Sequence, residues 1–79
     1  MPQSAKHFAE KLNQCLDDMG APNHIRERST ILSKMLNISK HEAWGLLEGH
    51  QMPDTELLRM IATEFEVDLN WLVGEKEKQ

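Results

Sequence analysis

Apolar residues recur along the chain at helical spacing, and no segment shows the alternation typical of a strand. The first helical pattern follows Ser4, a residue able to cap a helix, and its apolar positions share one face: Phe8, Leu12, Cys15, Leu16 and Met19. Gly20 suits a helix end and Pro22 cannot continue the hydrogen-bond ladder. The pattern predicts a first helix that buries one stripe and ends near Gly20.

A second helix is predicted over residues 27–36, and its inward positions are Ile31, Leu32, Met35 and Leu36. The polar stretch "NHIRER" before it is either a loop or an early turn. Asn37 follows where the chain must stop and turn, a position that needs a positive φ, and Asn is the best substitute for Gly there. Ser39 and Glu42 have the spacing of a capping box, which predicts that a third helix starts at Ser39.

The third helix is expected to bury Ala43, Leu46 and Leu47 and to end at Gly49. This arrangement leaves the remaining side chains mostly outward: Lys40, His41, Trp44, Gly45 and Glu48. Two short helices joined by a tight turn, the second with an outward polar face, are typical of a helix-turn-helix.

Asp54 is expected to cap a fourth helix, the clearest amphipathic segment, with apolar positions Leu57, Leu58, Ile61, Ala62 and Phe65. Val67 and Leu72 flank Asp68 as a hydrophobic staple, which predicts a short fifth helix that carries Trp71 and ends at Gly74. A short charged tail, "EKEKQ", occupies residues 75–79. We therefore expect a compact, all-α, five-helix domain over residues 1–79.

The net charge of −4 argues against binding a polyanion, but the charges are unevenly distributed. Acidic residues concentrate in residues 54–74, where Arg59 is the one basic residue. Residues 23–53 carry more basic than acidic side chains and also contain His24, His41 and His50. Any anion-binding face is expected in this middle segment.

Several functional classes find no support in the sequence. Cys15 is the one cysteine, which fits a reducing cytoplasm, and it is expected to act as a small, semi-buried hydrophobe. We expect a soluble, cytoplasmic protein without a membrane segment, because the chain has no export signal and no long apolar stretch. The His and Cys residues lack metal-ligand spacing, and no catalytic triad or carboxylate pair is evident. We expect no metal, no cofactor and no enzymatic activity.

The sequence resembles the phage-repressor (Cro-like, xenobiotic-response-element-type) DNA-binding family, especially the subgroup with R-x-R before the second helix. The resemblance covers roughly residues 8–75 and is carried by "GAP…RERS", "ILSKMLNIS", "LLEGHQMPDTELLRMIATEFEV" and "DLNWLVGE". It implies that the helix-turn-helix proper spans about residues 27–48 and that the chain binds double-stranded DNA. Ser33 stands where the family usually has Ala, and Asn37 where it usually has Gly.

The same resemblance implies roles for individual residues. Those at positions that commonly approach base edges are Lys40, His41, Trp44 and Gly45. Those at positions that usually contact the phosphate backbone are Arg26, Arg28, Ser29, His50 and Gln51. Ser29 replaces a common Gln, and its shorter hydroxyl is expected to reach phosphate.

Trp44 departs from the family pattern, which has a small or polar residue there, and three interpretations are open for it. It is a wedge in the DNA groove, an anchor for a protein partner, or a residue folded against the first helix. Glu42 and Glu48 also add negative charge to the third helix, although Glu42 has a capping role.

Two functions follow from these features. The first is a sequence-specific DNA-binding transcriptional regulator, a homodimer whose recognition helices lie about 34 Å apart. Trp71 is then either part of the core or part of the dimer surface. The second is a protein-interaction module, such as an antirepressor or adaptor, with Trp44 as its anchor.

Overall fold

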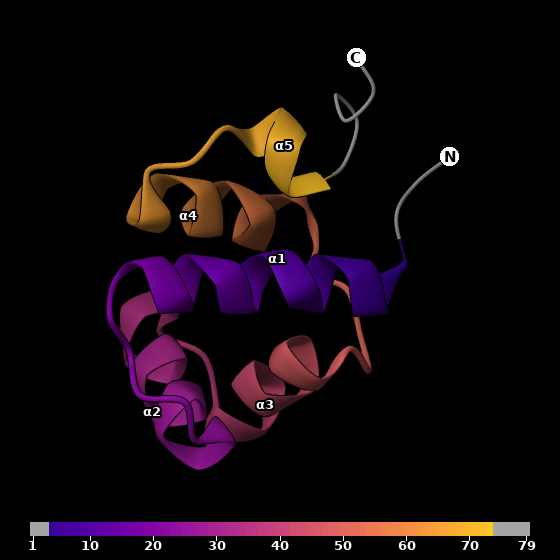
Figure 1. Ribbon diagram of the computed structural model, residues 1–79. Helices are drawn as coiled ribbons and strands as arrows, with labels where there is room; N and C mark the ends of the chain where they lie inside the picture. Colours follow the sequence, from indigo (N-terminus) through magenta and orange to yellow (C-terminus); the bar gives the residue numbers. More distant parts are fainter. Residues whose placement is uncertain (1–3, 74–79) are drawn as a thin grey trace.

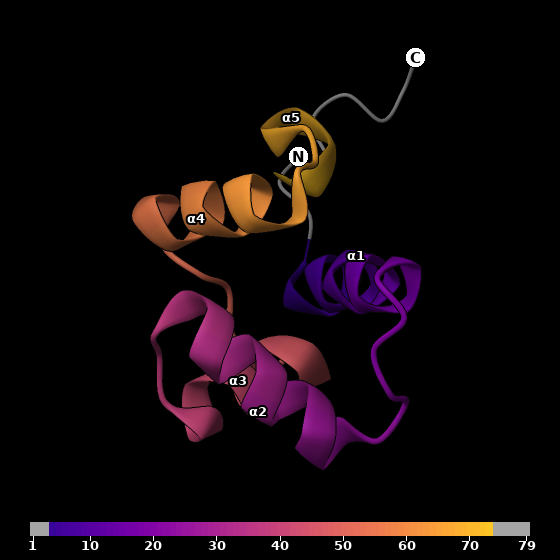
Figure 2. The ribbon, with the colours of Figure 1, turned by 90° about the vertical axis from the view of Figure 1, so that its left-hand side faces the viewer.

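The computed structural model describes residues 4–73, which form five α-helices and no strand. The helices are α1 (Ala5–Asp18), α2 (Ile25–Leu36), α3 (Lys40–Glu48), α4 (Thr55–Phe65) and α5 (Leu69–Val73). In Figure 1, α1 crosses the middle of the molecule, with α4 and α5 on one side and α2 and α3 on the other. Figure 2 shows α1 nearly end-on and α2 crossing in front of α3. The predicted all-α class is confirmed, whereas Gly74 and the charged tail lie outside the described residues.

All five helices contribute to one apolar core. Its buried members are Phe8, Leu12, Leu16, Leu32, Leu36, Ala43, Leu46, Leu47, Leu57, Ile61 and Leu72. These residues lie on the helix faces that the apolar spacing predicted. Because each fully buried Leu, Ile or Phe side chain contributes about 1.5–3 kcal/mol, their burial is the main stabilising term.

Two sulfur-containing residues of the first apolar stripe have opposite outcomes. Met19 was expected inside but is 52% exposed, because α1 ends at Asp18 and Met19 lies at the cap, beyond the last helical turn. Cys15 is buried as predicted. Burial, with a smaller contribution from Asp18, raises the pKa of the Cys15 thiol, so the residue stays neutral and packs as a small hydrophobe.

The helix starts are stabilised by side chains that accept hydrogen bonds from free backbone N–H groups. The side chains of three predicted caps each accept a hydrogen bond from the backbone N–H three residues later, as capping requires: Ser4, Ser39 and Asp54. The N–O distances are 3.1, 3.0 and 2.9 Å. Asp68 likewise accepts from the Asn70 N–H at 3.1 Å. Within the described residues only the Ser39 half of the predicted capping box forms.

Helix α2 begins earlier than predicted, at Ile25 rather than residue 27. His24 is its N-cap, and the imidazole Nδ1 accepts a hydrogen bond from the Arg26 N–H at 3.2 Å. The polar stretch before the predicted start therefore supplies the first turn of the helix. A histidine cap is uncommon, which is why the sequence left this boundary open.

The ends of α1 to α4 share one geometry, in which a residue with positive φ stops the helix. These residues are Gly20 (φ 81°), Asn37 (φ 57°), Gly49 (φ 81°) and Glu66 (φ 55°). The next residue then donates its N–H to a carbonyl five positions earlier, at 2.9–3.1 Å. The prediction for Asn37 is confirmed. Glu66 was not foreseen, because Glu is not a residue that favours the left-handed region.

Gly49 also brings α3 close to α1. A Cβ atom at this position would lie 3.0 Å from the Lys6 Cα, so the end of α3 packs directly against the first turn of α1. Its positive φ and this close approach both require glycine. The contact fixes one end of α3 on the body of the protein.

We predict that Glu66→Gly raises the free energy of unfolding by about 1 kcal/mol, because glycine removes the steric cost of the left-handed conformation. Asn37→Gly is expected to be neutral or slightly stabilising, whereas Asn37→Val lowers stability by about 1–2 kcal/mol. Urea unfolding of the three variants measures these differences. Equal stabilities for the Gly and Val variants at position 37 would contradict the left-handed conformation of Asn37.

Candidate nucleic-acid interface

Helix α3 has a buried face and an exposed face. Ala43, Leu46 and Leu47 are inside the core, as predicted. Lys40 and His41 are exposed on the opposite side. The turn at residues 37–39 and the Ser39 cap fix where the helix starts, so the two exposed residues lie in its first turn.

Trp44 lies on the exposed face between two histidines. The His41 ring stacks on the indole with centroids 5.9 Å apart, and the His50 ring meets it edge-on at 4.7 Å. The side chain is 37% exposed and does not belong to the core or to the apolar residues packed against it. The interpretation that Trp44 folds inward against α1 therefore does not hold.

Gly45 is buried, contrary to the prediction that it faces outward for a base contact. The side chain of Gln51 covers it: a Cβ at position 45 would lie 3.3 Å from the Gln51 Cδ. Gln51 also approaches the Glu42 carbonyl, with an Nε2–O distance of 3.5 Å. Gly45 therefore provides space for Gln51, and Gln51 rather than Gly45 is at the surface.

Arg28 was expected to contact DNA phosphate, but the structure places it in the interior at 4% exposure. Its Nε donates to the Pro22 carbonyl at 2.6 Å, and its Nη1 donates to the Asn13 side chain at 2.9 Å and carbonyl at 3.2 Å. Its Nη2 forms an ion pair with Asp17 and a 3.3 Å hydrogen bond to Asn23. The guanidinium is thus occupied by α1 and by the loop that joins α1 to α2.

Ser29 is also buried, at 5% exposure, and its hydroxyl oxygen has no hydrogen-bond partner among the described residues. The hydroxyl does not reach the surface, so the expected phosphate contact is not available in this conformation. Three other residues predicted at phosphates, Arg26, His50 and Gln51, are exposed. Their roles remain predictions.

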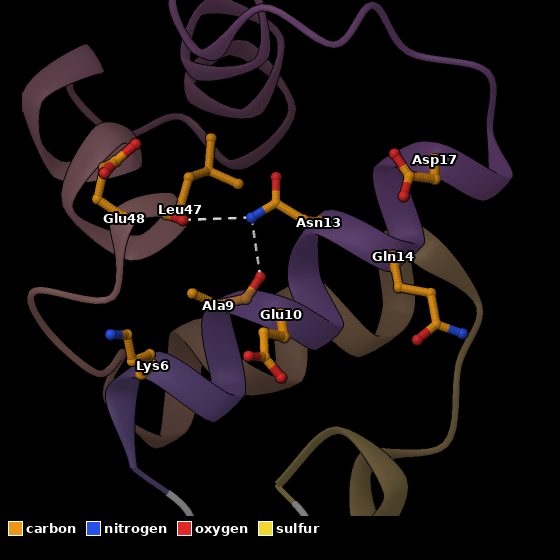
Figure 3. A pocket seen from close by; sticks show the side chains of 8 residues that line it. All are labelled: Lys6, Ala9, Glu10, Asn13, Gln14, Asp17, Leu47 and Glu48. Atoms are coloured by element: carbon orange, nitrogen blue, oxygen red, sulfur yellow. Dashed lines mark hydrogen bonds between the residues drawn. The ribbon is translucent and has the colours of Figure 1, made fainter.

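Asn13 was not singled out from the sequence, yet it connects α1 to both other helices on this side. Besides accepting from Arg28, its Nδ2 donates to the Ala9 carbonyl at 3.0 Å and to the Leu47 carbonyl at 3.2 Å (Figure 3). The Leu47 carbonyl belongs to the last turn of α3, where intrahelical donors run out. In the sequence, the one sign of this role is that Asn13 is a polar residue next to Leu12, a member of the first apolar stripe.

The same region holds a shallow groove of about 510 Å³ between α1 and the end of α3. Figure 3 shows its lining, which includes the carboxylates of Glu10, Asp17 and Glu48 together with Lys6. Its acidic character makes it unsuitable for a nucleic-acid backbone.

Trp71, in α5, packs against the core. The Lys11 Nζ lies 5.2 Å from the centroid of its ring and donates a 2.7 Å hydrogen bond to its backbone carbonyl. Lys11 and Trp71 therefore join α1 to α5. Trp71 was expected to belong either to the core or to a dimer surface. Its contacts within the chain are those of a core residue.

Residues 4–73 contain no cluster of His, Cys, Asp and Glu side chains able to hold a metal ion. Over the same residues, no helix has the length and apolar character needed to cross a membrane. No protein-family model matches the sequence, and comparisons with curated proteins and with solved structures found no match either. The functional interpretation therefore depends on the residues and their geometry.

Two neighbouring arginines of α2 should behave differently on substitution. Arg28→Ala is expected to lower the free energy of unfolding by about 2–4 kcal/mol, because it leaves the partners of a buried guanidinium unpaired. Arg28→Lys should recover little, since an ammonium cannot reproduce the forked geometry. Arg26→Ala, an exposed control two residues away, should change stability by no more than about 0.5 kcal/mol. If Arg28→Ala and Arg26→Ala changed the free energy of unfolding equally in thermal or urea unfolding, the Arg28 contacts would not stabilise the fold.

Proposed function

We propose that this protein is a sequence-specific regulator of transcription that binds double-stranded DNA through a helix-turn-helix. In this proposal α2, the turn at residues 37–39 and α3 form the motif, and α3 enters the major groove. One observation carries the proposal: α3 follows a sharp left-handed turn and exposes Lys40, His41 and Trp44 together on its free side.

The dimensions of α3 are compatible with this role. Its nine residues correspond to a rod about 14 Å long, and a major groove about 12 Å wide admits an α-helix. Base-edge contacts come from Lys40 and His41, whereas Arg26, His50 and Gln51 contact phosphates. Arg28 takes no part in DNA contact and instead holds α2 against α1.

The distribution of charge also favours DNA binding on the α3 side of the protein. The acidic residues Asp54, Glu56, Glu64, Glu66 and Asp68 belong to the α4–α5 region and are exposed there. Figure 1 shows that α4 and α5 lie across α1 from α2 and α3. A DNA duplex on the α3 side is therefore separated from this group of acidic residues, which reduces repulsion.

A homodimer accounts for useful affinity, because one helix-turn-helix contacts only one half-site. We place the dimer surface where α4 meets α5, the helix that carries Trp71. An open groove of about 380 Å³ there is lined by Ala62, Val67 and Leu69 with Arg59 and Thr63 at its edges. Its partly apolar lining suits contact with a second copy of the chain.

A second function is favoured by the exposure of Trp44 and Met52, at 37% and 41%. Large exposed apolar side chains are typical anchors of protein interfaces. In this alternative the protein is an antirepressor or adaptor that uses the same scaffold, with Trp44 at the centre of the contact. Glu42 and Glu48 on α3 are better tolerated by a protein partner than by DNA.

The experiment that tests the proposal is selection of a binding site from random duplex DNA, followed by affinity measurements over a range of salt concentrations. The logarithm of the affinity should fall steeply with the logarithm of salt, by about 0.9 per phosphate contact. Arg26→Ala should weaken specific and random DNA alike and reduce this slope by about one contact. Lys40→Ala should chiefly relax base preference, at a cost of about 1–3 kcal/mol at one position.

Failure of the wild-type protein to prefer any sequence over random duplex at moderate salt would contradict the regulator function. A folded Trp44→Ala variant that keeps its DNA affinity but loses a protein partner would favour the interaction module instead.

A further inference from the structure

Trp44 differs from Lys40 and His41, its exposed neighbours on α3, because it carries a large apolar ring together with an N–H donor. Its side chain is more than one third exposed, and its ring contacts are those with His41 and His50. Its indole N–H donates no hydrogen bond within residues 4–73. Trp44 therefore combines a partly exposed apolar ring with an N–H donor that no group within residues 4–73 accepts.

The two histidines also limit how Trp44 can move. His41 stacks on the indole with an interplanar angle of 25°, and His50 meets it at 78°, so neighbours restrain the ring from two directions. A restrained aromatic ring loses little conformational entropy when it binds. Trp44 follows Lys40 by four residues, so both project from the same side of α3, about one turn apart.

The major groove offers a limited set of partners for such a side chain. Thymine is the one unmodified base that presents an apolar group there, its C5-methyl, and the O4 acceptor lies beside it. Adenine presents the N7 acceptor beside an amino donor, cytosine presents an amino donor, and guanine presents two acceptors, but none of these three bases carries an apolar group there. The thymine edge therefore matches both features of Trp44.

We propose that Trp44 makes this protein select thymine at one position of each half-site, by packing its indole against the C5-methyl group and donating its N–H to O4. This assignment rests on the proposed DNA-binding function and adds a specificity-determining residue to it. Lys40, one turn earlier, then contacts a neighbouring base pair.

The test uses the duplex that the wild-type protein selects from a random library. Each thymidine is replaced in turn by deoxyuridine, which keeps the pairing and O4 but removes the methyl group. Dissociation constants are measured by fluorescence anisotropy for the wild type, for Trp44→Ala and for Met19→Ala, a control at an exposed apolar residue of the α1 cap. Thermal unfolding establishes that each variant is folded.

At one thymidine per half-site, deoxyuridine should weaken wild-type and Met19→Ala binding about fourfold, the value of one buried methyl group. Trp44→Ala should bind the two duplexes equally. The proposal is overturned if the wild type tolerates deoxyuridine at every position, or if Trp44→Ala retains the fourfold difference. Failure to enrich any duplex is a distinct outcome: it contradicts the proposed function itself, and the thymine contact with it.

Discussion

The buried guanidinium of Arg28 is the constraint on which the arrangement of α1, α2 and α3 depends. A charge in the interior must be satisfied by nearby polar groups, and here Asp17, Asn13, Pro22 and Asn23 provide them. These partners belong to α1 and the following loop, so α2 can take only the orientation that places Arg28 among them. Asn13 extends the network to the Leu47 carbonyl and thereby connects the same interaction to α3.

This polar network and the apolar core set the direction in which α3 faces. Leu46 and Leu47 draw one side of the helix inward, and the close approach of Gly49 to Lys6 fixes its end. The opposite side is left to solvent, where His41 and His50 hold Trp44 at the surface. The surface proposed for DNA contact is therefore oriented by the Arg28 network, the core leucines and Gly49, none of which is itself proposed to contact DNA.

Local rules predicted much of the fold, because helix faces, caps and the turn at Asn37 depend on residues close in sequence. They failed where the side-chain placement of a loop decides the outcome: the side chain of Gln51, from the loop after α3, covers Gly45. Arg28 could have been recognised, since it shares the buried stripe of α2 with Leu32 and Leu36 at four-residue spacing. The family resemblance instead implied a phosphate contact for it.

The chain contains two tryptophans, and they provide the most direct test of where DNA binds. In a two-dimensional ¹H–¹⁵N spectrum each gives one indole N–H signal, Trp44 from the exposed face of α3 and Trp71 from the α1–α5 contact. On titration with the selected duplex, at a protein concentration where the dimer is already formed, our account predicts that the Trp44 indole and the backbone amides of α3 shift, while the Trp71 indole stays in place. Shifts at Trp71 and α5 with an unchanged Trp44 would contradict it.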